Sequence, residues 1–258
     1  MLPFEKTIID LFKTEGVEYK FDSKHHILNS GKINIEFIPY CSLPEYQPSS
    51  ADDLPPNTIR VWEDQVVNSQ AVIESRILSF LGISKRIHAR ETEVKEISQQ
   101  VFIEFVVINH MNIPTSGKYR YGLFKNDELV AVAAFGRSCP IDQDGKRYKS
   151  HELIRFGNIL NHTVVGGLSK LIRHFEQAVK PEHIMTYVDR EWSEGKSLLK
   201  LGFKKVGITP AQTFYIDPDI CIRRYRSEFP GDIDEDREND GWQVIKNLGS
   251  IKLVKILV

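Results

Sequence analysis

A strand, a glycine loop, a helix and a second strand follow one another between Ser150 and Phe203, and this order constrains the fold more than any other feature. The segment His151–Phe156 alternates in side-chain character with the period of two that is typical of a strand in a sheet. The alternation predicts one face made of Glu152, Ile154 and Phe156 and an opposite face made of His151, Leu153 and Arg155.

Two adjacent glycines, Gly166 and Gly167, stand where the next helix is expected to begin. Glycine has no Cβ atom, so a ligand can approach the backbone closely, and the free N–H groups of a first helical turn favour an anion. Helical spacing of apolar residues predicts a helix over Gly167–Val179 that covers one face of a sheet. The candidate phosphate-binding residues are Val165, Gly166, Gly167, Ser169 and Lys170.

The second strand, Ile184–Val188, delivers Asp189 and Arg190 at its carboxyl end, where open α/β sheets usually gather functional side chains. Trp192 and Ser193 follow directly. Such a polar strand end predicts the acceptor side of an active site.

These motifs resemble the acyl-CoA-binding half of the GCN5-related N-acetyltransferase (GNAT) fold, and the resemblance is carried by ELIRF, VVGGLSKL, YVDREWSEG and KLGF. Within that superfamily they are most similar to the branch with phage Mom-type DNA-modification proteins and the carboxyl-terminal part of Hef-like homing endonucleases. The resemblance implies an α+β fold, with a mixed, mostly antiparallel sheet flanked by helices. It also implies acetyl-CoA or another acyl-CoA as the donor.

Acyl transfer to an amine requires a base, and Glu152 is the first candidate, followed by Asp189, with Arg190 and Ser193 beside them. A carboxylate half buried in a sheet can have its pKa raised enough to act near neutrality. The alternative is that Glu152 forms a structural pair with Arg155 or Arg190.

The resemblance places two candidate substrate contacts at His110 and Asn112, and Arg155 on the first strand is a third candidate. The alternative for His110 is a position at a helix end, beside the negative pole of the helix dipole.

The sequence departs from the superfamily pattern at two places. The phosphate loop usually begins with arginine or glutamine and ends in glycine or alanine, where this chain has Thr163 or Val164 and Ser169. The tyrosine that commonly protonates the leaving thiolate corresponds to Leu198. A proton from Ser193, Tyr187 or water is therefore expected.

The amino-terminal part carries a second resemblance, through KINIEF and IRVWEDQVVNSQAVIESRILSFLGI, to the end of the Vsr-type nuclease domain of Hef-like proteins. That family holds magnesium with an aspartate and a glutamate. Glu36 matches the glutamate, whereas His25 and His26 stand where the aspartate belongs. Neighbouring side chains on a strand point to opposite faces, so these histidines are not expected to chelate. We therefore expect a nuclease-like segment that has no nuclease activity and binds no metal.

Composition sets the remaining limits. The net charge of −1 excludes a globally basic nucleic-acid binder but permits a local positive face. The three cysteines, Cys41, Cys139 and Cys221, are isolated in the sequence, which favours a reducing cytoplasm, that of the host if the chain is phage-encoded. The first residues contain charges in every apolar run, so neither a signal peptide nor a membrane span is expected.

The expected domains are a degenerate nuclease-like α/β segment at 1–84, a GNAT-like acyltransferase domain at 85–217 and a charged extension with a final strand at 218–258. An apolar helix over Gln99–Met111 is expected to be largely buried, and Phe203–Thr209 and Thr213–Ile216 are expected to be the last paired strands. In the tail, the basic segment Ile222–Arg226 suits a nucleic-acid backbone, and an acidic run follows it.

Three functions fit these features. The first is an N-acyltransferase for a base or modified base in phage DNA, so that DNA is the expected partner. The second is a DNA-binding relative of a homing endonuclease without catalysis, and the third is an acyltransferase for a small amine or a protein. The sequence carries no signal for the number of subunits.

Overall fold

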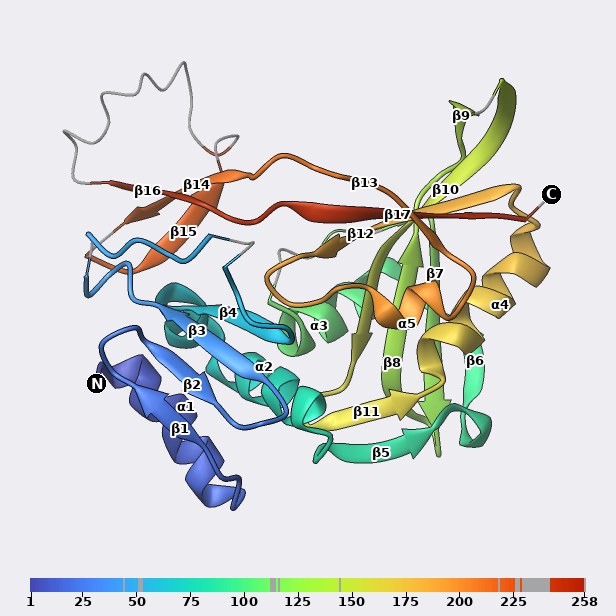
Figure 1. Cartoon of the computed structure of the whole chain (residues 1–258). Helices are drawn as coiled ribbons and strands as arrows, with labels where there is room; N and C mark the ends of the chain where they lie inside the picture. Colours follow the sequence, from blue (N-terminus) through green and yellow to red (C-terminus); the bar gives the residue numbers. More distant parts are fainter. Residues whose placement is uncertain are drawn as a thin grey trace. The chain divides into compact units, whose positions relative to one another are not determined.

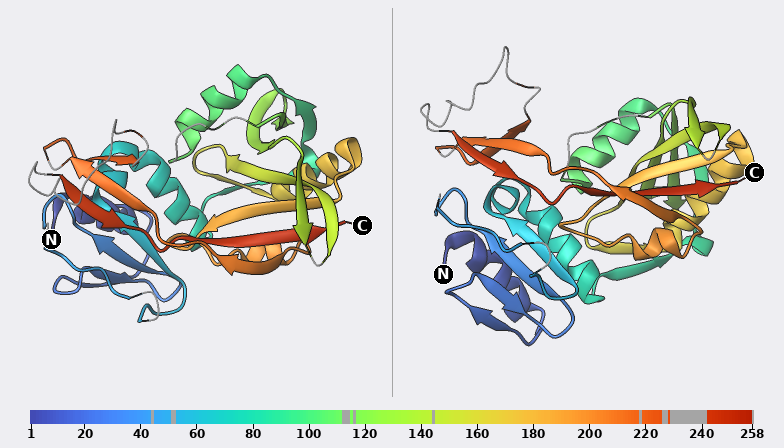
Figure 2. Two further views of the ribbon diagram at one scale, coloured as in Figure 1. Left: turned by 90° about the horizontal axis from the view of Figure 1, so that it is seen from above. Right: turned by 45° about the horizontal axis from the view of Figure 1, so that its top comes forward.

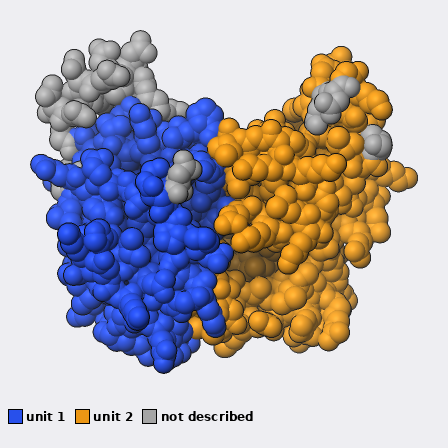
Figure 3. Space-filling model, viewed as in Figure 1, with its two compact units in different colours: residues 1–74, 189–193, 209–250 blue, residues 75–188, 194–208, 251–258 orange. Residues whose placement is uncertain are grey.

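The computed structural model describes residues 1–43, 45–50, 53–111, 115, 117–143, 145–217, 219–225, 228 and 242–257. The chain divides into two units, each made of three segments (Figure 3). Unit 1 contains residues 1–74, 189–193 and 209–250, and unit 2 contains residues 75–188, 194–208 and 251–258. This division differs from the expected boundaries, because the segment 209–250 belongs with the amino-terminal residues.

A helix and a four-stranded sheet form the first part of unit 1 (Figure 1). The elements are α1 (Pro3–Thr14), β1 (Lys20–Asp22), β2 (Ile27–Asn29), β3 (Asn34–Ile38) and β4 (Thr58–Trp62), in the sheet order β1-β2-β3-β4. The pair β3–β4 is parallel and the others are antiparallel. Phe4, Ile8 and Phe12 are buried along one side of α1, as its amphipathic pattern predicts. The helix α2 (Glu63–Leu81), which has a kink at Ser69, begins in unit 1.

The second part of unit 1 is an antiparallel sheet of β14 (Thr213–Asp217), β15 (Ile222–Tyr225) and β16 (Gln243–Lys246), in the order β15-β14-β16. Its apolar face is buried against Ile38 and Trp62 of the first sheet. The expectation that Thr213–Ile216 pairs with Phe203–Thr209 is therefore wrong, because β14 pairs with β15 and β16 instead.

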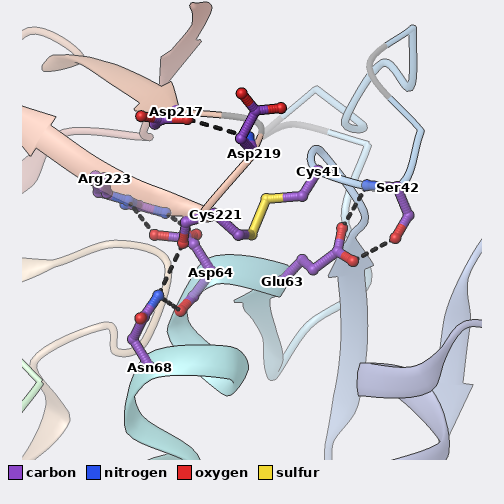
Figure 4. The surroundings of a disulfide bond; sticks show 9 residues. All are labelled: Cys41, Ser42, Glu63, Asp64, Asn68, Asp217, Asp219, Cys221 and Arg223. Carbon is purple, nitrogen blue, oxygen red and sulfur yellow. Dashed lines mark hydrogen bonds and ion pairs between the residues drawn. A yellow bond between two sulfur atoms is a disulfide. The ribbon is translucent and has the colours of Figure 1, made fainter.

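A disulfide joins Cys41 to Cys221 within unit 1 (Figure 4). Beside it, the Asn68 side-chain amide donates to the Cys221 carbonyl oxygen at 2.8 Å. These two cysteines are isolated in the sequence, as expected, because 180 residues separate them, and only the fold brings them together. Cys139 is free and exposed. The inference of a reducing compartment thus loses its basis.

Unit 2 is built on an eight-stranded sheet of β6 (Glu93–Glu96), β7 (Tyr119–Lys125), β8 (Glu128–Phe135), β9 (Cys139–Gln143), β10 (Lys146–Asn158), β12 (His183–Asp189), β13 (Lys204–Ile208) and β17 (Ser250–Ile256). The order is β13-β17-β12-β10-β8-β7-β6, and β9 pairs with β10. In both views of Figure 2, the red strand β17 lies between orange strands of this sheet. The pair β10–β12 is parallel, while β6–β7, β7–β8, β8–β10, β9–β10 and β13–β17 are antiparallel. The mixed, mostly antiparallel α+β fold is confirmed. The final strand β17 is an inner strand of this sheet rather than part of an extension.

Helices cover both faces of this sheet. On one face, α4 (Gly167–Val179) buries Leu171, Ile172 and Phe175, and the Phe175 ring stacks on Phe135 with centroids 3.9 Å apart. The bounds of α4 are those that the sequence predicts. On the other face, α3 (Gln99–Asn109) packs on Val132 and Ala134. The expectation of a largely buried α3 is wrong for its outer side, where Ile108 is 62% exposed.

Shorter elements complete unit 2. The strands β5 (Lys85–His88) and β11 (His162–Val165) form a parallel pair, and η1 (Ala89–Glu91) and α5 (Lys196–Leu199) are single short helices. None of the helices in the described part of the chain has the length and apolarity needed to span a membrane.

Candidate functional site

A β-bulge interrupts β10 in the middle of the predicted site. The pairing of β10 with β8 shifts register between Leu153 and Arg155. Leu153 and Phe156 both belong to the core beneath α4, whereas Arg155 lies near His110. A bulge adds one residue to a strand and so changes which side chains share a face. The predicted alternation is therefore wrong beyond Leu153, and Phe156 does not share the face of Glu152.

The strands β10 and β12 pair only at their beginnings. Their parallel ladder contains the pairs Ser150–His183, His151–Ile184 and Glu152–Met185, although β10 continues to Asn158 and β12 to Asp189. Just past the ladder, the Thr186 hydroxyl donates to the Leu153 carbonyl oxygen at 2.8 Å. Separated strand ends leave backbone donors and acceptors available to an extended ligand.

The amino-terminal end of α4 presents backbone N–H groups. Gly166 precedes the helix with φ of 78°, in the left-handed region that glycine adopts without strain, and it is exposed. The backbone N–H groups of Gly167, Leu168 and Ser169 have no acceptor within the described residues, as is usual for a first helical turn. These groups and the helix dipole favour an anion.

Gly167 and Lys170 also have structural contacts of their own. A Cβ atom on Gly167 would lie 3.0 Å from Val164 Cγ1 and 3.2 Å from Leu123 Cδ1, so close packing as well as ligand access favours glycine there. The Lys170 ammonium group donates to the carbonyl oxygens of Ala89, at 2.8 Å, and of Thr92. Its side chain therefore lies along the flank of α4 facing η1.

Glu152 lies half buried on β10, at the point where the ladder with β12 ends. Burial raises the pKa of its carboxyl group, and the nearby Arg155 guanidinium opposes this effect. Arg190 donates to the Leu248 carbonyl oxygen at 2.8 Å, in unit 1. The effect of Arg155 on Glu152 agrees with the structural alternative, and the role of Glu152 as a base stays a prediction.

His110 and Arg155 lie together on the α3 side of the sheet. His110 Nδ1 is 3.5 Å from Arg155 Nη1. Burial, with Arg155 and Arg76 as further causes, lowers the pKa of His110 to about 3, so its imidazole is neutral at neutral pH. His110 is also the residue that ends α3, as the structural alternative predicts. Asn112 lies outside the described residues.

Glu152 shares this side of the sheet. A Cβ atom on Gly136, the residue after β8, would lie 3.7 Å from Glu152 Cβ and 3.6 Å from Ile154 Cδ1, on the face opposite to the buried Phe135. The structure thus brings Glu152, Arg155 and His110 to one face of the sheet.

The predicted residues that follow β12 belong to unit 1 and have structural contacts there. The Asp189 carboxylate accepts the backbone N–H of Glu191 at 2.9 Å, and the Asp189 carbonyl oxygen accepts that of Ser193 at 3.0 Å. The Arg190 guanidinium binds a carbonyl oxygen, as described above. These contacts account for the polar composition of the segment without an active site.

Glu191, which the sequence does not single out, is a buried carboxyl group of unit 1 with a strongly raised pKa. It is 2% exposed, and its Oε2 accepts Trp62 Nε1–H at 2.9 Å. Its Oε1 is buried and has no hydrogen-bond partner in the described part of the chain. Burial raises the pKa of Glu191 to about 8, and the neighbouring Asp189 adds to the effect. An uncharged carboxyl group therefore lies in the core at neutral pH.

The raised pKa of Glu191 predicts that the unfolding free energy depends on pH. The raised folded-state pKa means that the stabilisation is complete below the ordinary glutamate pKa of about 4.3 and is lost as pH rises through about 8. We expect up to about 1.4 kcal/mol of unfolding free energy to be lost per pH unit in that window. Glu191→Gln, which keeps an acceptor for Trp62, should remove this slope in urea titrations from pH 5 to pH 8. Identical slopes in the two proteins would contradict the assignment.

Glu36, the predicted metal ligand, forms a structural pair in unit 1. The Glu36 carboxylate is buried, accepts Arg60 Nε–H at 2.6 Å and accepts the Ser49 backbone N–H at 2.7 Å. His25 binds Asp22, and His26 binds Glu5. Within the described residues no group of three or more His, Cys, Asp or Glu side chains is placed to hold a metal ion.

Two residues considered for protonation of the thiolate differ in exposure. Leu198, whose aliphatic side chain has no proton to donate, is 6% exposed and belongs to the unit 2 core, whereas Tyr187 on β12 is 42% exposed.

In the basic segment, Arg223 forms two hydrogen bonds with Asp64, at 2.9 and 3.0 Å, and Arg224 is exposed and lies over the Trp242 ring. Arg226 and the acidic run lie outside the described residues.

Comparisons with known proteins give structural likeness only. No family model and no curated protein matches the sequence. Among solved structures, an IAA acetyltransferase from Bacillus cereus is 13% identical with a TM-score of 0.38, over 64% of this chain and 99% of that one. A Bacillus subtilis acetyltransferase in complex with CoA is 13% identical with a TM-score of 0.40, over 65% and 99%.

A third solved structure is a GNAT family acetyltransferase from Elizabethkingia anophelis with acetyl-CoA bound. It is 14% identical with a TM-score of 0.37, over 65% of this chain and 99% of that one. Likeness at this level does not place the chain in their family.

Proposed function

We propose that unit 2 is an N-acyltransferase that takes its acyl group from a CoA thioester and passes it to an amine. The observation that carries this proposal is the separation of β10 from β12 beyond Glu152, in a sheet covered by a helix that starts with unpaired N–H groups. The separated strands suit an extended arm with amide groups. The N–H groups of Gly167, Leu168 and Ser169 suit the pyrophosphate that ends such an arm.

Glu152 is the proposed base of the reaction. It removes a proton from the amine, whose nitrogen attacks the thioester carbonyl carbon, and the carbon–sulfur bond then breaks as the new amide forms. The raised pKa of Glu152 supports this role because a base is most effective when its pKa lies near the working pH. The leaving thiolate takes its proton from Tyr187 or water, since Ser193 belongs to unit 1. The buried Leu198 makes the usual tyrosine route unavailable.

The neutral imidazole of His110 and the cation of Arg155 are the proposed acceptor contacts. A neutral imidazole has one nitrogen that donates a hydrogen bond and one that accepts a hydrogen bond, and it carries no positive charge that would lower the pKa of Glu152. We propose an amine on a base or modified base in phage DNA as the acceptor. This substrate rests on the motif resemblance and on the exposed Arg224 beside Trp242, a pairing that suits a nucleic-acid backbone.

Acetyl-CoA is the first test. At about one hundred times its dissociation constant, it should add about 2.7 kcal/mol to the unfolding free energy. DNA incubated with protein and acetyl-CoA should then yield an acetylated nucleoside in mass spectrometry. Absence of stabilisation would reject the donor site and favour a non-catalytic DNA-binding protein. Stabilisation with acetylation of a small amine or a peptide, but not of DNA, would overturn the acceptor alone.

A further inference from the structure

A pocket of about 470 Å³ lies on the flank of α4 that faces η1 and β6. Ala89 and Val94 supply an apolar wall, and Arg90, Lys170, Arg173 and His174 supply polar groups. None of the described residues that line it comes from β10 or β12. The pocket is thus separate from the interval between those strands, but its lining shares Gly166, Ser169 and Lys170 with the predicted phosphate loop.

The charges around this pocket are positive. Lys170 is held at the wall by two carbonyl oxygens, which are neutral acceptors, so its charge is fixed without being compensated there. Arg90 and Arg173 are exposed. The described lining contains no aspartate or glutamate. Three cations around one cavity favour an anionic ligand.

Three acidic residues of the neighbouring elements, Glu91, Glu93 and Glu176, pair with lysines outside the pocket lining. Glu91 lies 2.8 Å from Lys125 Nζ, and Glu176 lies 2.6 Å from Lys255 Nζ. Glu93 pairs with Lys95 at 3.6 Å. These carboxylates are therefore drawn away from the pocket, and its positive charges remain for a ligand.

We propose that this pocket binds the phosphate of a nucleotide-sized ligand. The volume falls in the range of small-molecule sites, and an apolar wall beside cations matches a flat ring that carries a phosphate. Arginine binds phosphate with two parallel hydrogen bonds, which gives Arg90 and Arg173 the main part in recognition. The phosphate can belong to a free nucleotide or to the nucleotide end of the acyl-CoA donor, and only the second source rests on the proposed function.

Calorimetric titration with adenosine monophosphate tests the pocket. Arg90→Gln and Arg173→Gln should each weaken binding by about tenfold, because each removes a charge-assisted contact. Arg86→Gln, which changes an exposed arginine of β5 outside the pocket, should leave binding unchanged. Affinity should also fall as salt rises. Failure of the probe to bind, or equal affinity in all four proteins, would overturn the proposal.

Repeating the titration with saturating CoA distinguishes the two sources. Competition between CoA and the probe would assign the pocket to the nucleotide end of the donor, and simultaneous binding would assign it to a free nucleotide. Probe binding that depends on Arg90 and Arg173 in a protein that does not bind CoA would retain the pocket and reject the proposed function.

Discussion

Replacing Ser169 with glutamate is expected to abolish acetyl-CoA binding while leaving unit 2 folded. Ser169 lies in the first turn of α4, where its backbone N–H is unpaired in the described residues. A carboxylate there places a negative charge where the pyrophosphate would bind, and like charges at a binding site cost several kcal/mol, so affinity should fall about 100-fold or more. The same carboxylate stabilises a helix start by about 0.3–1 kcal/mol.

The two effects of Ser169→Glu have opposite signs, which makes the experiment decisive. Thermal unfolding without ligand should occur at an unchanged or higher temperature, and the stabilisation by acetyl-CoA should disappear. Ser169→Gln, similar in size and uncharged, should retain the stabilisation within a few-fold in affinity. This position is better than Gly167, because a side chain at Gly167 would press on Val164 and Leu123 and disturb the fold itself. Acetyl-CoA binding by the glutamate variant at wild-type affinity would reject the helix start as the phosphate site.

The sequence predicts the elements of this site better than their contacts. The bounds of α4 follow from local signals, namely a glycine pair, an apolar helical face and Pro181 beyond the end. The bulge of β10 depends on its partner β8, so no local pattern contains it. The same holds for β17, whose place inside the sheet is set by strands distant in the sequence.

Side-chain partners are also non-local. Lys170 stands in the predicted phosphate loop, yet the fold offers it the carbonyl oxygens of η1 and of Thr92. Glu191 looks like an ordinary polar residue after a strand, and only its burial against Trp62 raises its pKa. The pairing of Cys41 with Cys221 depends on where the segment 209–250 packs. Local patterns locate a helix start, whereas tertiary packing decides which charges remain for chemistry.

Glu152→Gln is expected to lower kcat by about 10² to 10³, because the loss of a positioned base typically costs this much. The affinity for acetyl-CoA should stay unchanged, since Glu152 lies on β10 rather than at the start of α4. Glu128→Gln is a matched control that neutralises an exposed carboxylate on β8, and it should keep wild-type kinetics.

The pH profile separates a base from a structural carboxylate. If Glu152 is the base, kcat falls as pH decreases below the raised pKa of Glu152. This decrease is the acid limb of the pH profile, and Glu152→Gln removes it. Arg155 lowers the same pKa, so Arg155→Gln should move the limb to higher pH without removing it. A structural Glu152 would instead change the unfolding temperature and leave both the limb and kcat in place, and that result would transfer the role of the base to another group.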